Sequence, residues 1–363
     1  MGRSIWAWAR LLGGAGILAL VLWRLGTGAF LDGLRVLDAG ALVTALGIGA
    51  ATTLLSAWRW CLVARGLGMK LSLRAATADY YQALFLNAAL PGGVLGDVGR
   101  AVRHGRDEGD LGRGVRAVVL ERTAGQLVLL VVGALVLLLV PSPVLSLLKE
   151  HAAVAAAVSA AILVAGGLAM LALRRLRQGA SRAAKAARTG MSEIRVGLLS
   201  RQNGPGVLLA SAAVLAGHLA TFMVAARAAG SAASLLQLAP LLLLALIAMG
   251  LPVNVGGWGP REGVMAWAFG AAGLSAAQGL TIAVAYGILA FVAAAPGAAI
   301  VLARVLTRPK AVVVEPSIES VRVAAPISPA PVMAALPIIV PAPIPVIRRT
   351  VVRQPAYSGG VAA

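Results

Sequence analysis

The chain is long, apolar and basic, and this combination excludes a water-soluble domain. Its 363 residues are 60% hydrophobic and 12% charged, with a mean hydropathy of +0.89 and a formal net charge of +19. Soluble domains carry about 25% charged residues, so the composition predicts an integral membrane protein. The basic residues form short blocks between apolar runs, a pattern typical of cytoplasmic loops facing anionic lipid, so nucleic acid is not an expected partner.

About six apolar stretches are long enough to cross a bilayer, which takes roughly 20 helical residues. The first resembles a signal peptide, because Arg3 and Arg10 precede an apolar run. Its small-residue site at 27–29 is poor, and cleavage would remove half of the first pair of spans, so we interpret it as an uncleaved span. The stretches cover residues 5–23, 40–58, 115–140, 152–173, 206–226 and 279–302. The sequence thus predicts an all-α, polytopic membrane protein.

Two further apolar stretches, residues 80–96 and 238–273, are too short or too interrupted to cross. Each breaks at a Leu-Pro motif, in which a glycine follows five residues after the proline and an arginine nine residues after it. Backbone leaves a helix at membrane depth only where protein or a water-filled cavity satisfies its polar groups. We therefore interpret both stretches as re-entrant hairpins with the motifs at their tips. The alternative is an interfacial helix at 80–96 and one or two full spans within 238–273.

The distribution of basic residues predicts the orientation of the spans. One set of connecting loops is rich in them and the alternate loops are poor, which places the rich set and both termini in the cytoplasm. The rich loops carry Arg59, Arg65, Lys70 and Arg74, then Arg100, Arg103, Arg106, Arg113 and Arg116, then a block from Arg174 to Arg201. The two halves of the chain then become inverted copies. Inverted repeats whose broken helices meet near the midplane are a recurring transporter architecture.

The composition changes after the last predicted span. Residues 311–363 contain nine prolines, and no helix tolerates that density. We predict a Pro-rich, disordered cytoplasmic tail at 311–363 after a transmembrane domain at 1–310.

Ionisable residues near the first break are candidates for binding a ligand. Asp97 and Arg100 are three residues apart, so on a helix they share a face and can pair. An arginine there suits a lipid phosphate, because its planar fork bonds two oxygens at once. The alternative is a loop with solvated charges, an interpretation that we favour for Arg103 and Arg106.

Three other charged positions lie inside or beside apolar stretches. Glu121 and Arg122 follow the start of the stretch at 115–140, where charges usually face the protein interior or a cavity. The alternative is that the two side chains reach along the helix to the cytoplasmic membrane interface, where their charged ends are hydrated. We favour a functional role for Glu121. Arg261 and Glu262, at the second break, form either a binding pair or a structural pair whose charges neutralise each other.

Uncharged residues complete the candidate site. Gly256 and Gly257 permit close approach of the backbone to a ligand, and Asn87 adds an amide beside the first break. The candidate lipid-binding residues are Asn87, Pro91, Asp97, Arg100, Glu121, Arg122, Pro252, Gly256, Gly257, Arg261 and Glu262.

Cysteine and histidine are too sparse for redox or metal chemistry. The single cysteine, Cys61, excludes an intrachain disulfide, a CxxC pair and a cysteine zinc site. His104, His151 and His218 lie in separate segments without metal-ligand spacing. We expect no metal and no other cofactor, and we expect the mid-span His218 to bond a neighbouring helix rather than to relay protons.

Taken in order, the motifs resemble the lysylphosphatidylglycerol synthase transmembrane-region family over about residues 10–305. The resemblance rests on the sequences at 87–91, 96–100, 119–122, 251–252 and 256–259, and on Glu262. It implies a membrane domain similar to a lipid flippase. In the best-known members a soluble domain follows that transfers lysine from aminoacyl-tRNA to phosphatidylglycerol. Only the Pro-rich tail follows here, so we do not expect aminoacyl transfer. Other stand-alone relatives are associated with polyprenyl-linked glycan or hopanoid pathways, which leaves the lipid open.

The leading interpretation is a multi-pass protein of a bacterial plasma membrane that binds and translocates an anionic phospholipid or a lipid-linked intermediate. In this interpretation three arginines bind the phosphate, namely Arg100, Arg122 and Arg261. Three acidic residues balance charge or carry protons, namely Asp97, Glu121 and Glu262. Two alternatives stay open. One is a membrane-embedded transferase that uses a lipid or polyprenyl donor, or the accessory subunit of a membrane partner enzyme. The other is a non-catalytic scaffold.

Overall fold

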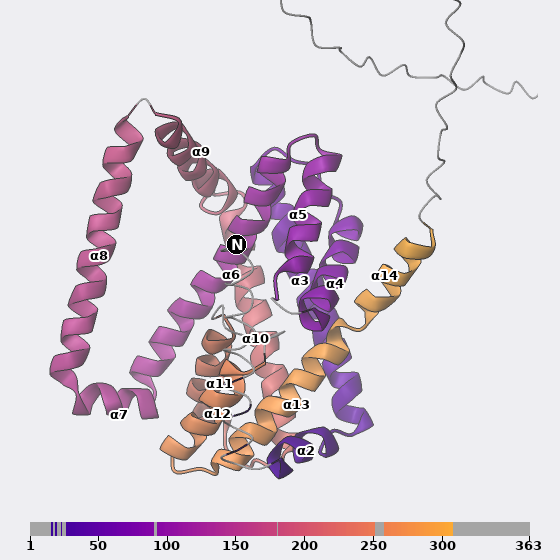
Figure 1. Cartoon of the computed structure of the whole chain (residues 1–363), viewed down its shortest axis with the longest axis vertical. Coiled ribbons are helices and arrows are strands. Elements are labelled where there is room, and N and C mark those ends of the chain that lie inside the picture. Colours follow the sequence, from indigo (N-terminus) through magenta and orange to yellow (C-terminus); the bar gives the residue numbers. More distant parts are fainter. Residues whose placement is uncertain are drawn as a thin grey trace, which may run out of the picture. The chain divides into compact units, whose positions relative to one another are not determined.

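A computed structural model describes residues 16, 19, 23, 27–90, 93–179, 181–250 and 258–307, and these residues build an all-α fold (Figure 1). Most of the first predicted span and the whole predicted tail lie outside the described residues. The same holds for four of the candidate site residues, which are Pro91, Pro252, Gly256 and Gly257.

Within the described residues, four helical segments are long and apolar enough to cross a membrane. They are α3 (Ala39–Gly66), α6 (Leu111–Leu139), α10 (Gly204–Ala228) and the consecutive helices α13 (Ala276–Ala294) and α14 (Pro296–Leu306). They coincide with four of the predicted spans, at 40–58, 115–140, 206–226 and 279–302. The predicted span at 152–173 falls in α8 (Ala152–Gln178), outside this set of four. A total of six spans therefore stays a prediction.

Short polar side chains determine where several helices begin. Asp38 accepts a hydrogen bond from the backbone N–H of Ala41 at 2.7 Å and caps α3. Asp110 accepts one from the N–H of Arg113 at 2.8 Å and caps α6, and this bond lowers the pKa of the Asp110 carboxyl. Such caps satisfy the unpaired N–H groups of a first helical turn. Three shorter helices complete the connections: α2 (Gly28–Arg35), α7 (Pro143–Glu150) and α9 (Arg182–Gly197).

Helices α4 (Leu73–Ala89) and α5 (Leu95–Asp107) pack against each other as the arms of a helical hairpin. Helix α4 ends at Ala89 because Leu90 is extended (φ −107°, ψ 142°), the conformation that a following proline imposes. The arms touch at Gly96, where a Cβ would lie 2.2 Å from the carbonyl oxygen of Ala83. This pair of helices occupies the stretch predicted as the first hairpin, at 80–96, but the two helices are longer than predicted and cover residues 73–107.

Helices α11 (Leu235–Met249) and α12 (Pro260–Ala271) form a second packed pair. Gly259 precedes α12 with a φ of +105°, which a side chain would disfavour, and its N–H donates to Glu262 Oε2 at 2.7 Å. Pro260 then occupies the first helical position, where its missing N–H costs nothing. This pair occupies the stretch predicted as the second hairpin, at 238–273.

The two halves of the chain repeat one order of helices: a long helix, two short packed helices and another long helix. The order is α3–α4–α5–α6 in the first half and α10–α11–α12–α13 in the second. Contacts between the halves correspond as well, because α6 packs against α11, α13 packs against α4, and α3 packs against α10. Figure 1 shows α11 and α12 beside α10 and α13. Insertion of the two hairpins into a membrane stays a prediction.

Helix α14 continues α13 after a break at Pro296 and packs against α4. Gly297 makes this contact close, since a Cβ there would lie 2.2 Å from the carbonyl oxygen of Tyr81. The largest apolar cluster consists mainly of residues from the second half of the chain, with Ala41, Ala45 and Leu129 added from the first half. Within it Phe222 of α10 stacks on Tyr286 of α13 with ring centroids 3.6 Å apart. The first hairpin lies between three helices, because α3 and α14 pack against α4 and α6 packs against α5.

Candidate functional site

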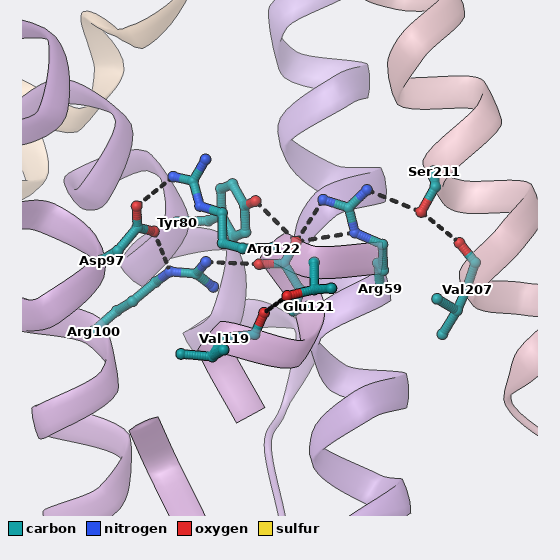
Figure 2. Close-up of polar contacts among 10 residues, drawn as sticks. Arg59, Tyr80, Asp97, Arg100, Val119, Glu121, Arg122, Val207 and Ser211 are labelled. Carbon is teal, nitrogen blue, oxygen red and sulfur yellow. Dashed lines mark hydrogen bonds and ion pairs between the residues drawn. The ribbon is translucent and has the colours of Figure 1, made fainter. Parts of the chain in front are cut away.

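Glu121 of α6 is the centre of a charged network between helices (Figure 2). Its side chain is 0% exposed, and both carboxylate oxygens are bonded. Oε2 accepts a hydrogen bond from Arg100 Nη2 at 2.7 Å, while Oε1 accepts one from Arg59 Nε at 2.9 Å and one from the Tyr80 hydroxyl at 3.1 Å. The prediction that Glu121 faces the protein interior is confirmed; a functional role for it stays a prediction.

Arg59 extends the network from α3 to α10. Its side chain is 5% exposed, and Nη1 donates to Ser211 Oγ at 3.1 Å, which in turn donates to the Val207 carbonyl at 2.8 Å. Assigning Arg59 to a cytoplasmic loop was therefore wrong, because α3 continues to Gly66. The apolar run that resumes at Trp60 was the sequence signal that the helix does not end there.

Arg100 of α5 is the second arginine bound to Glu121, and it is 1% exposed. Its Nε donates to Asp97 Oδ1 at 2.9 Å, so the predicted pair three residues apart is confirmed. Its guanidinium lies close to two aromatic rings, with Cζ 4.7 Å from the Trp60 centroid and 4.4 Å from that of Tyr80. Cation–π contacts with both rings stabilise the guanidinium in this position.

The network opens toward the surface at Arg122. This residue is 45% exposed and forms an ion pair with Asp97, which is 13% exposed. Asn87 fixes the same carboxylate, since its Nδ2 donates to Asp97 Oδ2 at 2.9 Å and its Oδ1 accepts from the Gly96 N–H at 2.8 Å. The amide of Asn87 thereby joins the end of α4 to the start of α5, on either side of the first break.

The network carries one positive charge in excess. Three arginines (Arg59, Arg100 and Arg122) face two carboxylates (Asp97 and Glu121). Charges with so little access to water are tolerated only when they are paired and hydrogen-bonded. A buried site with a net positive charge and one exposed arginine has the chemistry to attract a single anionic group.

Arg261 and Glu262 form a buried pair of their own, with side chains 2% and 0% exposed. Arg261 Nε donates to Glu262 Oε1 at 2.9 Å, so each charge neutralises the other, as the structural interpretation of this pair requires. The guanidinium again lies near two rings, with Cζ 4.8 Å from the Trp258 centroid and 5.4 Å from that of Tyr286. Arg261 of α12 therefore has the same kind of surroundings as Arg100 of the corresponding helix α5.

His218 is hydrogen-bonded to a neighbouring helix, as predicted. Its Nδ1 lies 3.1 Å from the Tyr286 hydroxyl, which joins α10 to α13 beside Arg261. Among the described residues, no hydrogen bond or ion pair joins Arg261 or Glu262 to the network around Glu121. The structure thus brings five candidates together, namely Asn87, Asp97, Arg100, Glu121 and Arg122, and places Arg261 with Glu262 elsewhere.

Arg103 is not the solvated loop residue that we expected. It forms an ion pair with Asp79 of α4 and donates to Gln82 Oε1 at 3.0 Å. Arg304 of α14 binds the same Asp79 carboxylate at 2.7 Å. Burial raises the pKa of Asp79, while the hydrogen bond from Arg304 opposes the rise. Arg106 is exposed, as expected.

Clusters of metal-ligating side chains concern only the part of the chain that the structure describes. No group of three or more histidine, cysteine, aspartate or glutamate side chains gathers there in a way that could hold a metal ion.

Comparisons with known proteins identify the family to which this chain is similar. A family description, "Lysylphosphatidylglycerol synthase TM region", matches residues 7–297. A search of curated proteins and a search of solved structures each find no significant match. The matched region includes both helical hairpins and every residue of the charged network.

Proposed function

The chain belongs to the lysylphosphatidylglycerol synthase transmembrane-region family, and from this premise we propose that it binds an anionic phospholipid or lipid-linked intermediate and translocates it across a bacterial plasma membrane. The family and the long apolar helices make the chain a multi-pass membrane protein associated with lipid-related processes. The observation that carries the proposal is the network around Glu121, which is positive by one charge, buried at one end and open at Arg122.

Recognition of the headgroup begins at Arg122 in this proposal. A lipid phosphate is tetrahedral, but two of its oxygens can accept hydrogen bonds from an arginine fork as a carboxylate does, so it replaces Asp97 on the exposed guanidinium. Asp97 then remains bound to Arg100 and Asn87, which keep its charge compensated inside the protein. The phosphate also neutralises the excess positive charge, which favours the bound state over the empty one.

The matching helix order of the two halves supports a path that begins at one hairpin and ends at the other. Arg100 and Arg261 lie on corresponding helices, and each is flanked by a carboxylate and two aromatic rings. In an inverted repeat the two hairpins open to opposite sides of the membrane. We propose that both termini are cytoplasmic and that the first hairpin opens to the cytoplasm.

Cysteine labelling tests this topology. After Cys61 is replaced, a cysteine at position 91 should react with a membrane-impermeant maleimide only from the cytoplasmic side, and one at position 252 only from the outside. Inside-out and right-side-out vesicles provide the two accesses. Labelling of both positions from one side would exclude the inverted arrangement.

Headgroup recognition is tested by Arg122→Gln. A charge-assisted hydrogen bond contributes about 1.5–3 kcal/mol, so we expect transfer of headgroup-labelled phosphatidylglycerol in proteoliposomes to fall by roughly tenfold or more. Stability should change by less than about 1 kcal/mol, because the pair with Asp97 is partly exposed.

Arg116→Gln is the matched control. Arg116 also lies on α6, is 40% exposed and binds a carboxylate, that of Glu193, but it lies outside the network. Its replacement should leave lipid transfer unchanged. Equal transfer by both variants would refute recognition at Arg122. Unfolding of the Arg122 variant alone would instead favour a non-catalytic scaffold whose charges only join helices.

A further inference from the structure

Three nitrogen atoms that lie around the Trp60 indole have no hydrogen-bond partner, although they are buried. They are Arg100 Nη1, Trp60 Nε1 and His104 Nε2, on side chains that are 1%, 0% and 4% exposed. Most buried polar groups in folded proteins are bonded, and each unsatisfied group carries a substantial desolvation penalty. Two of these atoms can only donate hydrogen bonds, and His104 Nε2 donates in one of its tautomers. Their gathering around one ring indicates a ligand atom that accepts hydrogen bonds.

The geometry joins the three side chains into one site. The Arg100 guanidinium lies over the Trp60 ring with Cζ 4.7 Å from the centroid, and His104 meets the same ring edge-on with centroids 5.4 Å apart. His104 follows Arg100 by four residues on α5, so both side chains lie on one face of that helix. The guanidinium is planar, so Nη1 donates in that plane, beside the nearby Trp60 and Tyr80 rings.

The chemistry of the three atoms selects the ligand. Arg100 Nη1 and Trp60 Nε1 can only donate hydrogen bonds, so the ligand atom must be an acceptor. The other two nitrogens of Arg100 are already bonded to Asp97 and Glu121, which leaves Nη1 as the remaining part of its fork. The network has a single positive charge in excess, so it holds one anion at a time. At the inner position an anionic oxygen satisfies both the donors and the charge, whereas water satisfies only the donors.

We infer that Trp60, Arg100 and His104 form an inner binding site for an oxygen of a phosphate-type anion, beyond the exposed Arg122. The inference rests on the proposed function only in naming a lipid as one source of the anion; inorganic phosphate is the other. The hydrogen-bond donors of α3 and α5 would hold the anion against the arm of the first hairpin. Trp60 and His104 thereby become binding residues, which no motif in the sequence had indicated.

The test uses the full chain in nanodiscs of phosphatidylcholine, titrated with radiolabelled inorganic phosphate. We expect saturable binding that Trp60→Phe and His104→Phe each weaken at least tenfold, because each removes a nitrogen and keeps a ring. Trp267→Phe is the control, since Trp267 is 46% exposed on α12; its affinity should match that of the unaltered protein. Thermal unfolding of each variant, measured without phosphate, shows whether it is folded. Because there are two independent variants, the binding site can still be tested if one of them does not fold.

The outcomes separate the sources of the anion and the two proposals. If phosphatidylglycerol in the nanodisc displaces phosphate, the occupant is a lipid headgroup; if it does not, the site takes a free anion. Unchanged affinity in both folded variants, or no phosphate binding by the unaltered protein with or without phosphatidylglycerol, would overturn the inner site and leave water as its occupant. Phosphate binding that depends on Trp60, in a protein that transports no lipid, would keep the site and reject the proposed function.

Discussion

Replacing Glu121 with glutamine should destabilise the protein by about 3–5 kcal/mol, the usual cost of removing one partner from a buried ion pair. Arg59 and Arg100 are 5% and 1% exposed and would both lose the carboxylate that compensates them. Glutamine keeps the shape but brings no charge, and its amide group places donors against the donors of the two arginines. Denaturant unfolding of the protein in mixed micelles measures the change.

Glu193→Gln is the control for this prediction. Glu193 also pairs with an arginine on α6, but the Arg116 side chain is 40% exposed and that of Glu193 15%. Its loss should cost about 0–1 kcal/mol, because water screens the pair. If the two glutamine variants were equally stable, Glu121 would not be the anchor of the network, and the alternative from the sequence that Glu121 carries protons would gain weight.

Adding a single methyl group at Gly96 is the second change for which we expect a large effect. In Gly96→Ala the new Cβ would lie 2.2 Å from the carbonyl oxygen and 2.5 Å from the Cα of Ala83. Both are backbone atoms, so the arms of the hairpin must separate, and overpacking of this kind costs about 1–3 kcal/mol or more. The shift also moves Gly96 away from Asn87, which accepts its N–H. We expect both lower stability and slower lipid transfer.

Gly99→Ala, three residues further along α5, separates this clash from the effect of alanine itself. A Cβ at Gly99 meets nothing within 4 Å. Alanine favours a helix over glycine by about 1 kcal/mol, so the variant should be as stable as the original protein or slightly more stable. A destabilised Gly99→Ala, or a Gly96→Ala that unfolds at the original denaturant concentration, would contradict the close packing of α4 on α5.

The helices could be predicted from the sequence because hydropathy is a local property. The stretches at 40–58 and 206–226 lie within α3 and α10. The ends of these helices extend beyond the stretches, because α3 begins at the Asp38 cap and α10 begins at a Gly-Pro pair that a hydropathy window omits. The break after Leu90 was predictable for the same reason, since a proline constrains the residue before it. The lengths of the hairpin arms were not, because α5 is polar and owes its helix to packing against α4 and α6.

The charged network was only partly predictable. Asp97 and Arg100 pair at a spacing that a helix makes obvious. Arg59 and Glu121 are 62 residues apart in sequence, and Arg304 meets Gln82 across 222 residues, so only the fold shows these partners. Arg59 and Arg103 were taken for loop charges because a list of basic residues carries no information on which ones become buried. Trp60 and Tyr80 were missed because an aromatic residue in an apolar run does not show which charge it will cover.

The length of α6 bears on the depth at which the network meets the lipid. Glu121 and Leu139, the last residue of the helix, are separated by about 27 Å at 1.5 Å per residue. A hydrocarbon core is about 30 Å thick, so a helix whose apolar end reaches the far boundary has Glu121 just inside the near one. On this geometry the backbone of Arg122 also lies a short way inside the boundary, and its long side chain extends toward the phosphates of the adjoining leaflet. A headgroup therefore reaches it by lateral diffusion without leaving its own layer.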